Sequence, residues 1–148
     1  MTKGFSPMEL VVVLAILAIT AALVAPGVGR TADGARVRAE VGAVAAFLRS
    51  AREHAVSRGQ AIEVRVDDQT HTLVMRRAGN AGETAGQATR AFSSLLRIAA
   101  DPPPPRVTFL PHGMSTGARF AIASGGARGY VITVDALTGR VTTARTGS

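Results

Sequence analysis

The sequence predicts an α+β fold in which one long N-terminal helix, apolar in its first half and amphipathic in its second, packs on antiparallel β-sheet. Residues 10–25 are all apolar except Thr20. Apolar residues then recur at alternating spacings of four and three up to residue 55, and from residue 61 the apolar period changes to two. Together these three patterns indicate one modest domain preceded by an N-terminal segment.

The composition of the 148 residues excludes some chemistry and leaves several classes of partner open. The chain has no cysteine, so disulfides and cysteine-based metal sites are excluded. Its formal net charge is +7, carried almost entirely by arginine, because Lys3 is the only lysine. Such a balance favours nucleic acid, acidic lipid or acidic protein as partners, although a GC-rich genome would also supply many arginines.

The N-terminal run from Phe5 to Ala25 would span about 31 Å as a helix, which is close to the hydrocarbon thickness of a bilayer. A secretory signal peptide fits poorly, because Glu9 lies where a leader is uncharged or basic and because Pro26 follows Ala25 without a good cleavage site. A plain membrane anchor leaves Glu9 unexplained. A carboxylate costs about 2.5–3.5 kcal/mol at the membrane centre, so such a residue usually has a partner.

The stretch KGFSPMEL, followed by the apolar run, resembles the class III leader and cleavage site of type IV pilins and pseudopilins. The resemblance rests on Gly4, Phe5 and Glu9. It implies that prepilin peptidase cuts between Gly4 and Phe5 and methylates the new Phe5 amine. It also implies that Glu9 pairs with the positive N-terminus of a neighbouring subunit in a filament. A carboxylate and an ammonium attract strongly in a low-dielectric bundle, so this pairing can set the register between subunits.

Pro7 departs from the leucine that is commoner at its place in these proteins. If the mature chain begins at Phe5, Pro7 lies in the first helical turn, where no backbone donor has an intrahelical partner. The departure therefore fits a helix that begins at the cleavage site. At the other end, Pro26 is predicted to kink or interrupt the helix, and residues 30–34 are predicted to form a polar joint.

The chain is predicted to have three parts, and the resemblance implies where each part lies in the cell. Residues 1–4 form a leader peptide, residues 5–29 a transmembrane and filament-core helix, and residues 30–148 a periplasmic domain. Within the domain, an amphipathic helix is expected over about residues 35–58 and β-structure over residues 61–148. The chain is then a single-pass protein of the bacterial inner membrane, with its C-terminal domain in the periplasm.

The amphipathic helix presents one apolar stripe, formed by Val37, Val41, Val44, Leu48, Ala51 and Ala55. Charged residues such as Arg49, Arg52 and Glu53 lie mostly off this stripe. The stripe is therefore predicted to pack on a sheet, with contact to another subunit as the alternative. Gly59 directly follows the last expected helical residue and is predicted to be the C-cap.

The β-rich part is predicted from alternation and turn residues. Residues 61–67 and 72–76 form a β-hairpin around the turn DQTH, and residues 77–90 form a loop rich in Gly, Ala and Thr. Residues 91–99 fit a strand or a helix equally well. DPPPP is an extended connector that cannot be a central strand. Further strands are expected at residues 106–110, 119–123, 129–135 and 140–145.

The C-terminal half resembles the H-type minor pseudopilins of type II secretion and the related minor pilins of type IV pili. The pattern is a strand with Phe, a Pro-x-Gly and Ser/Thr-Gly turn, another strand, and a Val-Asp-x-x-Thr-Gly-Arg-Val hairpin. Its residues here are Phe109, Pro111, Gly113, Ser115, Gly117, Val134, Asp135, Thr138, Gly139, Arg140 and Val141. Gly139 can adopt positive φ, and Asp135 and Thr138 can satisfy turn amides, so these residues build the fold. His112 replaces a frequently acidic residue, so no role of that acid carries over.

The two resemblances imply a type IV pilin-like fold and a minor pseudopilin, which is a structural subunit near the tip of the periplasmic pseudopilus. The implied partners are other major and minor pseudopilins in a filament, prepilin peptidase, the inner-membrane assembly platform and the membrane itself. No enzymatic activity, cofactor or metal is expected. The alternative that remains is a minor pilin of a type IV pilus, including one that takes up DNA.

Two other functions are disfavoured by the residues themselves. GMSTG matches the G-x-S-x-G nucleophile elbow of hydrolases, which would make the chain a membrane-anchored esterase. However, a strand pattern follows Ser115 where a helix is needed, and the last histidine, His112, precedes the serine. The histidines show no metal-ligand spacing. The arginines are scattered with little aromatic interleaving, so nucleic acid is not expected as a partner.

Overall fold

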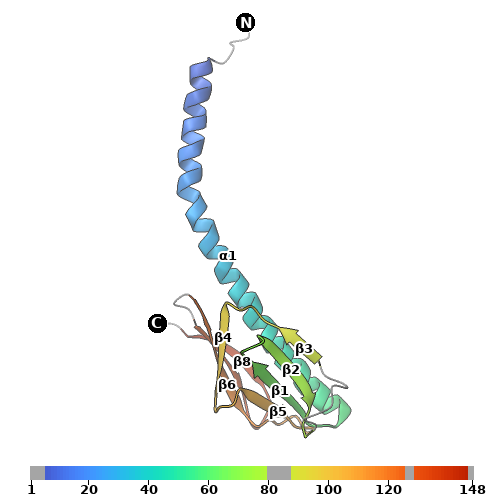
Figure 1. The fold of residues 1–148 in the computed structure, drawn as a ribbon. Coiled ribbons are helices and arrows are strands. Elements are labelled where there is room, and N and C mark those ends of the chain that lie inside the picture. The colour runs from blue at the N-terminus through green and yellow to red at the C-terminus, as the bar shows by residue number, and fades with distance from the viewer. Residues whose placement is uncertain (1–5, 80–87, 126–128, 147–148) are drawn as a thin grey trace. The chain divides into compact units, whose positions relative to one another are not determined.

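The computed structural model describes residues 6–79, 88–125 and 129–146, except for the side chains of residues 23–33. The chain divides into two compact units, Met1–Arg36 and Val37–Ser148, and each is considered by itself. In the described residues one helix is followed by eight strands (Figure 1). All of the strands belong to the second unit.

Helix α1 comprises Pro7–Arg58 and begins at the proline that the sequence places in a first helical turn. Ser6 precedes it, and the Ser6 carbonyl oxygen accepts hydrogen bonds from the N–H groups of Glu9 at 2.9 Å and Leu10 at 3.2 Å. Proline suits the first helical position because its missing N–H would have no intrahelical partner there. The predicted place of Pro7 in the first turn is confirmed.

The backbone of α1 is helical without a break through Pro26 and through residues 30–34. The predicted interruption at Pro26 and the predicted polar joint are therefore wrong, whereas the kink that was the other possibility at Pro26 stays a prediction. A proline in a helix interior costs about 3 kcal/mol, which the long helical segments on both sides can offset. Residues 30–34 contain no proline, and Arg30 and Ala32 are good helix formers, so composition alone does not stop the helix there.

The C-terminal end of α1 is closed by Gly59, as predicted. Gly59 has a positive φ of 61°. Its N–H donates to the Val56 carbonyl oxygen at 3.4 Å, and the Gln60 N–H donates to the Ala55 carbonyl oxygen at 3.1 Å. These two bonds form a Schellman motif, in which a glycine in the left-handed conformation ends the helix.

The eight strands form two antiparallel sheets of four strands each. The first sheet has the order β3-β2-β1-β5, with β1 at Ile62–Asp67, β2 at Thr72–Arg77, β3 at Ala88–Ala91 and β5 at Arg106–Phe109. The second sheet has the order β4-β6-β7-β8, with β4 at Leu96–Asp101, β6 at Ala118–Ser124, β7 at Gly129–Val134 and β8 at Val141–Thr146. The α+β class, the first hairpin and the four later strands are confirmed.

One segment differs from the prediction, and another settles a choice that the sequence left open. The predicted loop extends too far, because residues 88–91 form β3. This strand pairs with β2 in the register Thr72↔Ala91 to Met75↔Ala88. Every side chain of β3 is exposed, so no alternation marks it, and backbone pairing at the sheet edge decides its conformation. The ambiguous segment forms strand β4, with Leu96 and Ile98 buried. Residues 80–87 of the predicted loop lie outside the described residues.

One hydrophobic core joins the second half of α1 to both sheets. The predicted stripe is buried at Val41, Val44, Leu48, Ala51 and Ala55, with Val37 packed against it. Fully buried partners from the sheets include Phe109 of β5, Phe120 of β6 and Ile132 of β7. The predicted packing of the stripe on a sheet is confirmed. This core holds the hairpin of β7 and β8 at a fixed place against α1.

Candidate functional site

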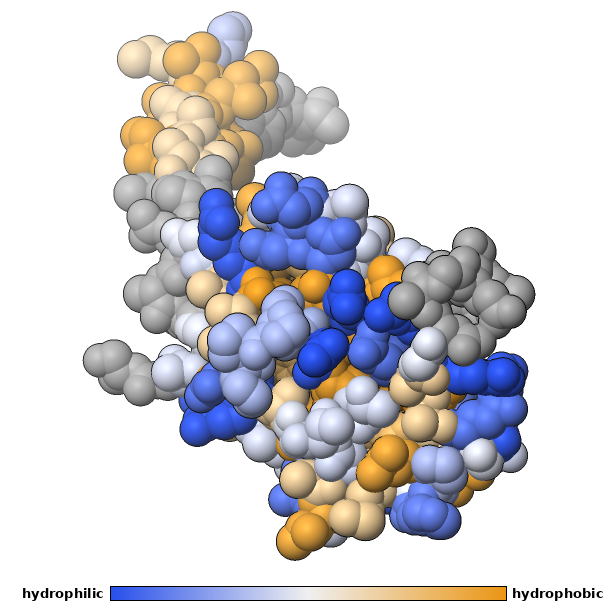
Figure 2. All heavy atoms as spheres, turned by 60° about the horizontal axis from the view of Figure 1, so that its bottom comes forward, coloured by the Kyte–Doolittle hydropathy of each residue, from blue (hydrophilic) through white to orange (hydrophobic). Residues whose placement is uncertain are grey.

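The first turns of α1 carry large apolar side chains that are exposed in the structure. Its exposed large side chains are Met8, Leu10, Val11, Val12, Val13, Leu14, Ile16, Leu17 and Ile19, each 43–77% exposed. Five consecutive members turn through more than a full helical circle, so the apolar surface surrounds the helix. Figure 2 shows this surface in orange. Exposed apolar area of this extent indicates contact with protein or lipid.

Thr20 does not interrupt this apolar surface. Its Oγ1 donates to the carbonyl oxygens of Ile16 and Leu17, at 2.9 Å each. The hydroxyl is therefore satisfied within the helix, as is common for threonine in apolar helices.

Among the described residues, no helix is both long enough and apolar enough to cross a membrane.

Glu9 is the acidic residue in the first turn of α1, and it is exposed. A negative charge there is favourable because the helix macrodipole is positive at that end. Among the described residues, no cation lies within ion-pair distance of Glu9. Gly4 and Phe5, the two predicted processing residues, lie outside the described residues. The structure thus places Glu9 at the start of an uncovered apolar helix.

The C-terminal motif residues come together in two loops, residues 110–117 and 135–140. The Ser115 N–H donates to the Ala136 carbonyl oxygen at 2.8 Å. The Ser115 Oγ donates to the Asp135 carbonyl oxygen at 2.8 Å and accepts from the Gly117 N–H at 3.0 Å. Ser115 is only 7% exposed, and strand β6 follows it. Its hydroxyl therefore locks the two loops together, and the geometry of a nucleophile elbow is not present.

Asp135 organises the turn between β7 and β8, as the sequence predicts. Its Oδ1 accepts from the Thr138 N–H and Oγ1, both at 2.8 Å, and from the Leu137 N–H at 3.1 Å. The Thr138 backbone bond, followed by that of the Thr138 hydroxyl, lowers the pKa of Asp135 below its ordinary value of 3.8. Gly139 closes the turn with a φ of +62°, so its predicted positive φ is confirmed.

Arg52 of α1 ties the helix to both loops. Its Nε donates to the Gly113 carbonyl oxygen at 3.2 Å and to the Thr138 carbonyl oxygen at 3.1 Å. A Cβ on Gly139 would collide with the Gly113 carbonyl oxygen and would lie 3.0 Å from the Arg52 Nε. The two glycines therefore allow the close approach on which this connection depends. Helical periodicity predicted no role for Arg52, because it indicates only that this residue lies off the apolar stripe.

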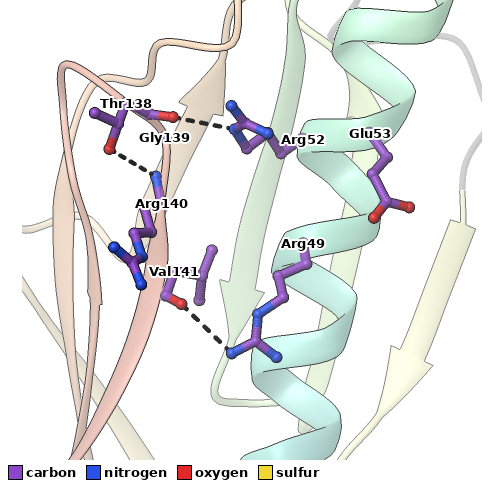
Figure 3. Close-up of a pocket in the computed structure, with 7 residues that line it drawn as sticks. All are labelled: Arg49, Arg52, Glu53, Thr138, Gly139, Arg140 and Val141. Atoms are coloured by element: carbon purple, nitrogen blue, oxygen red, sulfur yellow. Dashed lines mark hydrogen bonds between the residues drawn. The ribbon is translucent and has the colours of Figure 1, made fainter.

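A groove of about 530 Å³ opens beside this connection. Its walls are Arg49, Arg52 and Glu53 of α1 and residues 138–141 of the hairpin (Figure 3). Arg49 Nη2 donates to the Val141 carbonyl oxygen at 3.4 Å. No pattern in the sequence predicted this groove. Within the described parts of the chain, no cluster of His, Cys, Asp and Glu could hold a metal ion.

A helix that leads into two antiparallel four-stranded sheets, with a locked hairpin against the helix, defines a type IV pilin-like fold. The type IV minor pilin FimU of Pseudomonas aeruginosa matches with a TM-score of 0.61 and 22% identity, over 72% of this chain and 91% of that chain. The minor pseudopilin EpsH from the type 2 secretion system of Vibrio cholerae matches with a TM-score of 0.59 and 18% identity, over 75% of this chain and 98% of that chain. These likenesses show the fold.

The family is shown by the sequence itself. The family model described as type II transport protein GspH matches residues 40–139, which is more than half of the chain. The chain therefore belongs to the GspH family, and the resemblance to H-type minor pseudopilins is confirmed. No protein of curated function matches the chain.

Proposed function

We propose that this chain is a minor pseudopilin of a type II secretion system and a structural subunit near the tip of the periplasmic pseudopilus. The observation that carries the proposal is the GspH family match over residues 40–139. The exposed apolar helix headed by Glu9 supports it, because a filament subunit needs a surface that other subunits cover. The domain acts by contact and has no catalytic activity, cofactor or metal of its own.

The N-terminal segment is processed by prepilin peptidase and then mediates assembly. Prepilin peptidase removes residues 1–4 by cutting between Gly4 and Phe5, and the new Phe5 amine is methylated. Residues 5–29 span the inner membrane once before assembly, and residues 30–148 lie in the periplasm. The inner-membrane assembly platform then transfers the subunit into the filament, where lipid contacts are replaced by contacts with other pseudopilins.

Glu9 directs this transfer. Its carboxylate pairs with the positive Phe5 amine of a neighbouring subunit, and each group would be costly to leave alone in an apolar bundle. The pair therefore favours one register between subunits over others. Processing and assembly are linked by this chemistry, since the Phe5 amine does not exist until the leader is removed.

A minor pilin of a type IV pilus is the second candidate. The observation that favours it is the similarity to the minor pilin FimU, which has a TM-score of 0.61 against 0.59 for the minor pseudopilin EpsH. Both proteins are distant in sequence, so the fold is common to the two branches. The family match is the reason to prefer type II secretion.

A deletion strain separates the two candidates. We expect loss of exoprotein release, with twitching motility and DNA transformation unchanged, and full rescue by the wild-type gene supplied in trans. Loss of twitching or transformation with normal release would assign the chain to a type IV pilus. If release, twitching and transformation all remained normal, neither filament would depend on this subunit and the proposal would fail.

A further inference from the structure

The groove between α1 and the hairpin concentrates positive charge. Three arginines, Arg49, Arg52 and Arg140, line it together with a single carboxylate, that of Glu53. In Figure 3 the Arg49 and Arg52 side chains extend from α1 towards the hairpin, whereas the Glu53 side chain lies along the helix away from it. Within the described residues, none of the three arginines forms a salt bridge, and neither does Glu53. The groove therefore has an excess of positive charge that the domain leaves unneutralised.

Two of the three arginines, Arg49 and Arg52, are held in place by hydrogen bonds of their own side chains. Arg52 uses its Nε for the carbonyl oxygens of Gly113 and Thr138. Arg49 uses one terminal nitrogen for the Val141 carbonyl oxygen. Arg140 follows a turn that Asp135 and Gly139 fix. Donors on rigid elements lose little entropy when they bind, so the groove is pre-organised for an anion.

We propose that this groove is a docking site for the carboxylate side chains of an acidic segment of a neighbouring protein subunit. The identity of that neighbour as a filament subunit rests on the proposed function. Guanidinium groups bind carboxylates through two parallel hydrogen bonds, and the pair is selective for planar anions. The groove volume of about 530 Å³ suits a few side chains of a peptide rather than a large ligand.

Nucleic acid is a poorer fit to the same charges. Its recognition combines a basic groove that tracks many phosphates with aromatic side chains that stack on bases. None of the residues that line this groove is aromatic, so a nucleic-acid base would find no stacking partner there. A short acidic peptide needs no such stacking partner.

The test is a titration of the full chain in detergent micelles with a tetraglutamate peptide blocked at both ends. Blocked tetraglutamine and an oligothymidylate serve as comparison probes, and binding is measured by calorimetry and by amide chemical shifts. We expect tetraglutamate to bind, to weaken with added salt, and to shift amides of residues 138–141. Tetraglutamine should not bind.

Arg140→Gln is the informative variant, because Arg140 is exposed and its backbone bonds in the turn are retained. We expect tetraglutamate affinity to fall about twofold to fivefold, and Arg49→Gln to act similarly. Arg145→Gln is the matched control, because it removes an exposed arginine of β8 outside the groove, and it should leave affinity unchanged.

Three results would overturn the docking site: no binding of tetraglutamate, equal effects of Arg140→Gln and Arg145→Gln, or tighter binding of oligothymidylate. The last result would instead indicate nucleic acid. Exoprotein release by the Arg140→Gln strain and by the deletion strain is measured in parallel. Absent peptide binding with a secretion defect on deletion would defeat the groove alone and leave the proposed function standing.

Discussion

The two units of this chain use the same kinds of apolar residue in opposite ways. In the second unit Leu48 is 1% exposed in a core that the chain closes by itself, whereas in the first unit Leu14 is 56% exposed. Figure 2 shows the same contrast, with orange residues on the N-terminal helix and mostly hydrophilic residues on the visible face of the domain. The domain is stabilised by its own core, whereas we propose that other subunits cover the apolar side chains of the N-terminal helix.

The charged residues repeat the contrast. Glu63 of β1 forms an ion pair with Arg76 of β2, with Oε1 and Nη2 2.6 Å apart, and both side chains are mostly buried. Glu9 has no such partner among the described residues. One carboxylate is neutralised by the fold, and for the other we propose a partner on a neighbouring subunit. The difference between the units is therefore a difference in where each finds its partners.

The largest expected effect comes from removing the Glu9 carboxylate. Glu9→Ala should still insert into the membrane, because the run stays apolar, but its incorporation into filaments should fall about tenfold or more, because a neighbour's amine loses its partner. Subunit content of isolated filaments and of membranes measures the two quantities. Glu63→Ala, the matched control, should lower domain stability and leave incorporation near normal. Normal incorporation of Glu9→Ala would refute the pairing.

A core truncation compares the same residue type in the two units. Leu48→Ala should lower the free energy of unfolding by about 2–5 kcal/mol, because it leaves a cavity in a packed core. Leu14→Ala should change it by less than about 0.5 kcal/mol, because Leu14 has no packed partner within the domain. Urea unfolding of both variants in detergent checks this. Equal losses would mean that Leu14 belongs to the folded core after all.

Much of the fold could be predicted because burial imposes a period on the sequence. The stripe from Val41 to Ala55 has one buried face, and Ile62, Val64 and Val66 alternate for the same reason. Strand β3 has no buried face, so it gave no signal. Pro26 favoured an interruption of the helix that does not occur, because the long helical segments on both sides override its local helix-breaking tendency.

The groove could not be predicted because its contacts are distant in sequence. Arg52 meets the Gly113 carbonyl 61 positions away and the Thr138 carbonyl 86 positions away. Turn residues such as Asp135 and Gly139 could be recognised locally, since an Asp-x-x-Thr-Gly turn has its own chemistry. No local pattern says which helical arginine the turn will meet.

Glycine substitutions test the close approach between the turn at Gly139 and the Gly113 carbonyl. Gly139→Ala should lower the free energy of unfolding by about 2–3 kcal/mol, since a Cβ there is strained at positive φ and also collides with the Gly113 carbonyl. Gly59→Ala isolates the backbone term, because its φ is similar at +61° and nothing lies within 4 Å of its Cβ. That variant should lose only about 1 kcal/mol. Equal losses would argue against the close approach at Gly139.

The smallest expected effect is an acid dependence from Asp135. Because folding lowers its pKa, the stabilisation is complete above the unfolded value of 3.8 and is lost as the pH falls through the lower folded value. Asp135→Asn should therefore be less stable than wild type at neutral pH, with the difference shrinking below about pH 4. Thr138→Val keeps the carboxylate but removes the hydroxyl donor, so it should show an intermediate change. Unfolding measured from pH 7 to pH 2 provides the test, and a constant difference would contradict the assignment.

The most direct test of the central claim is the mass of the N-terminal peptide of the chain recovered from filaments. The contrast between the units requires the amine partner of Glu9 to be created by processing at Phe5. We predict a peptide that begins at Phe5 and carries one methyl group on its amine. An intact Met1 in filament material would contradict the account, because the group that completes the N-terminal helix would not exist.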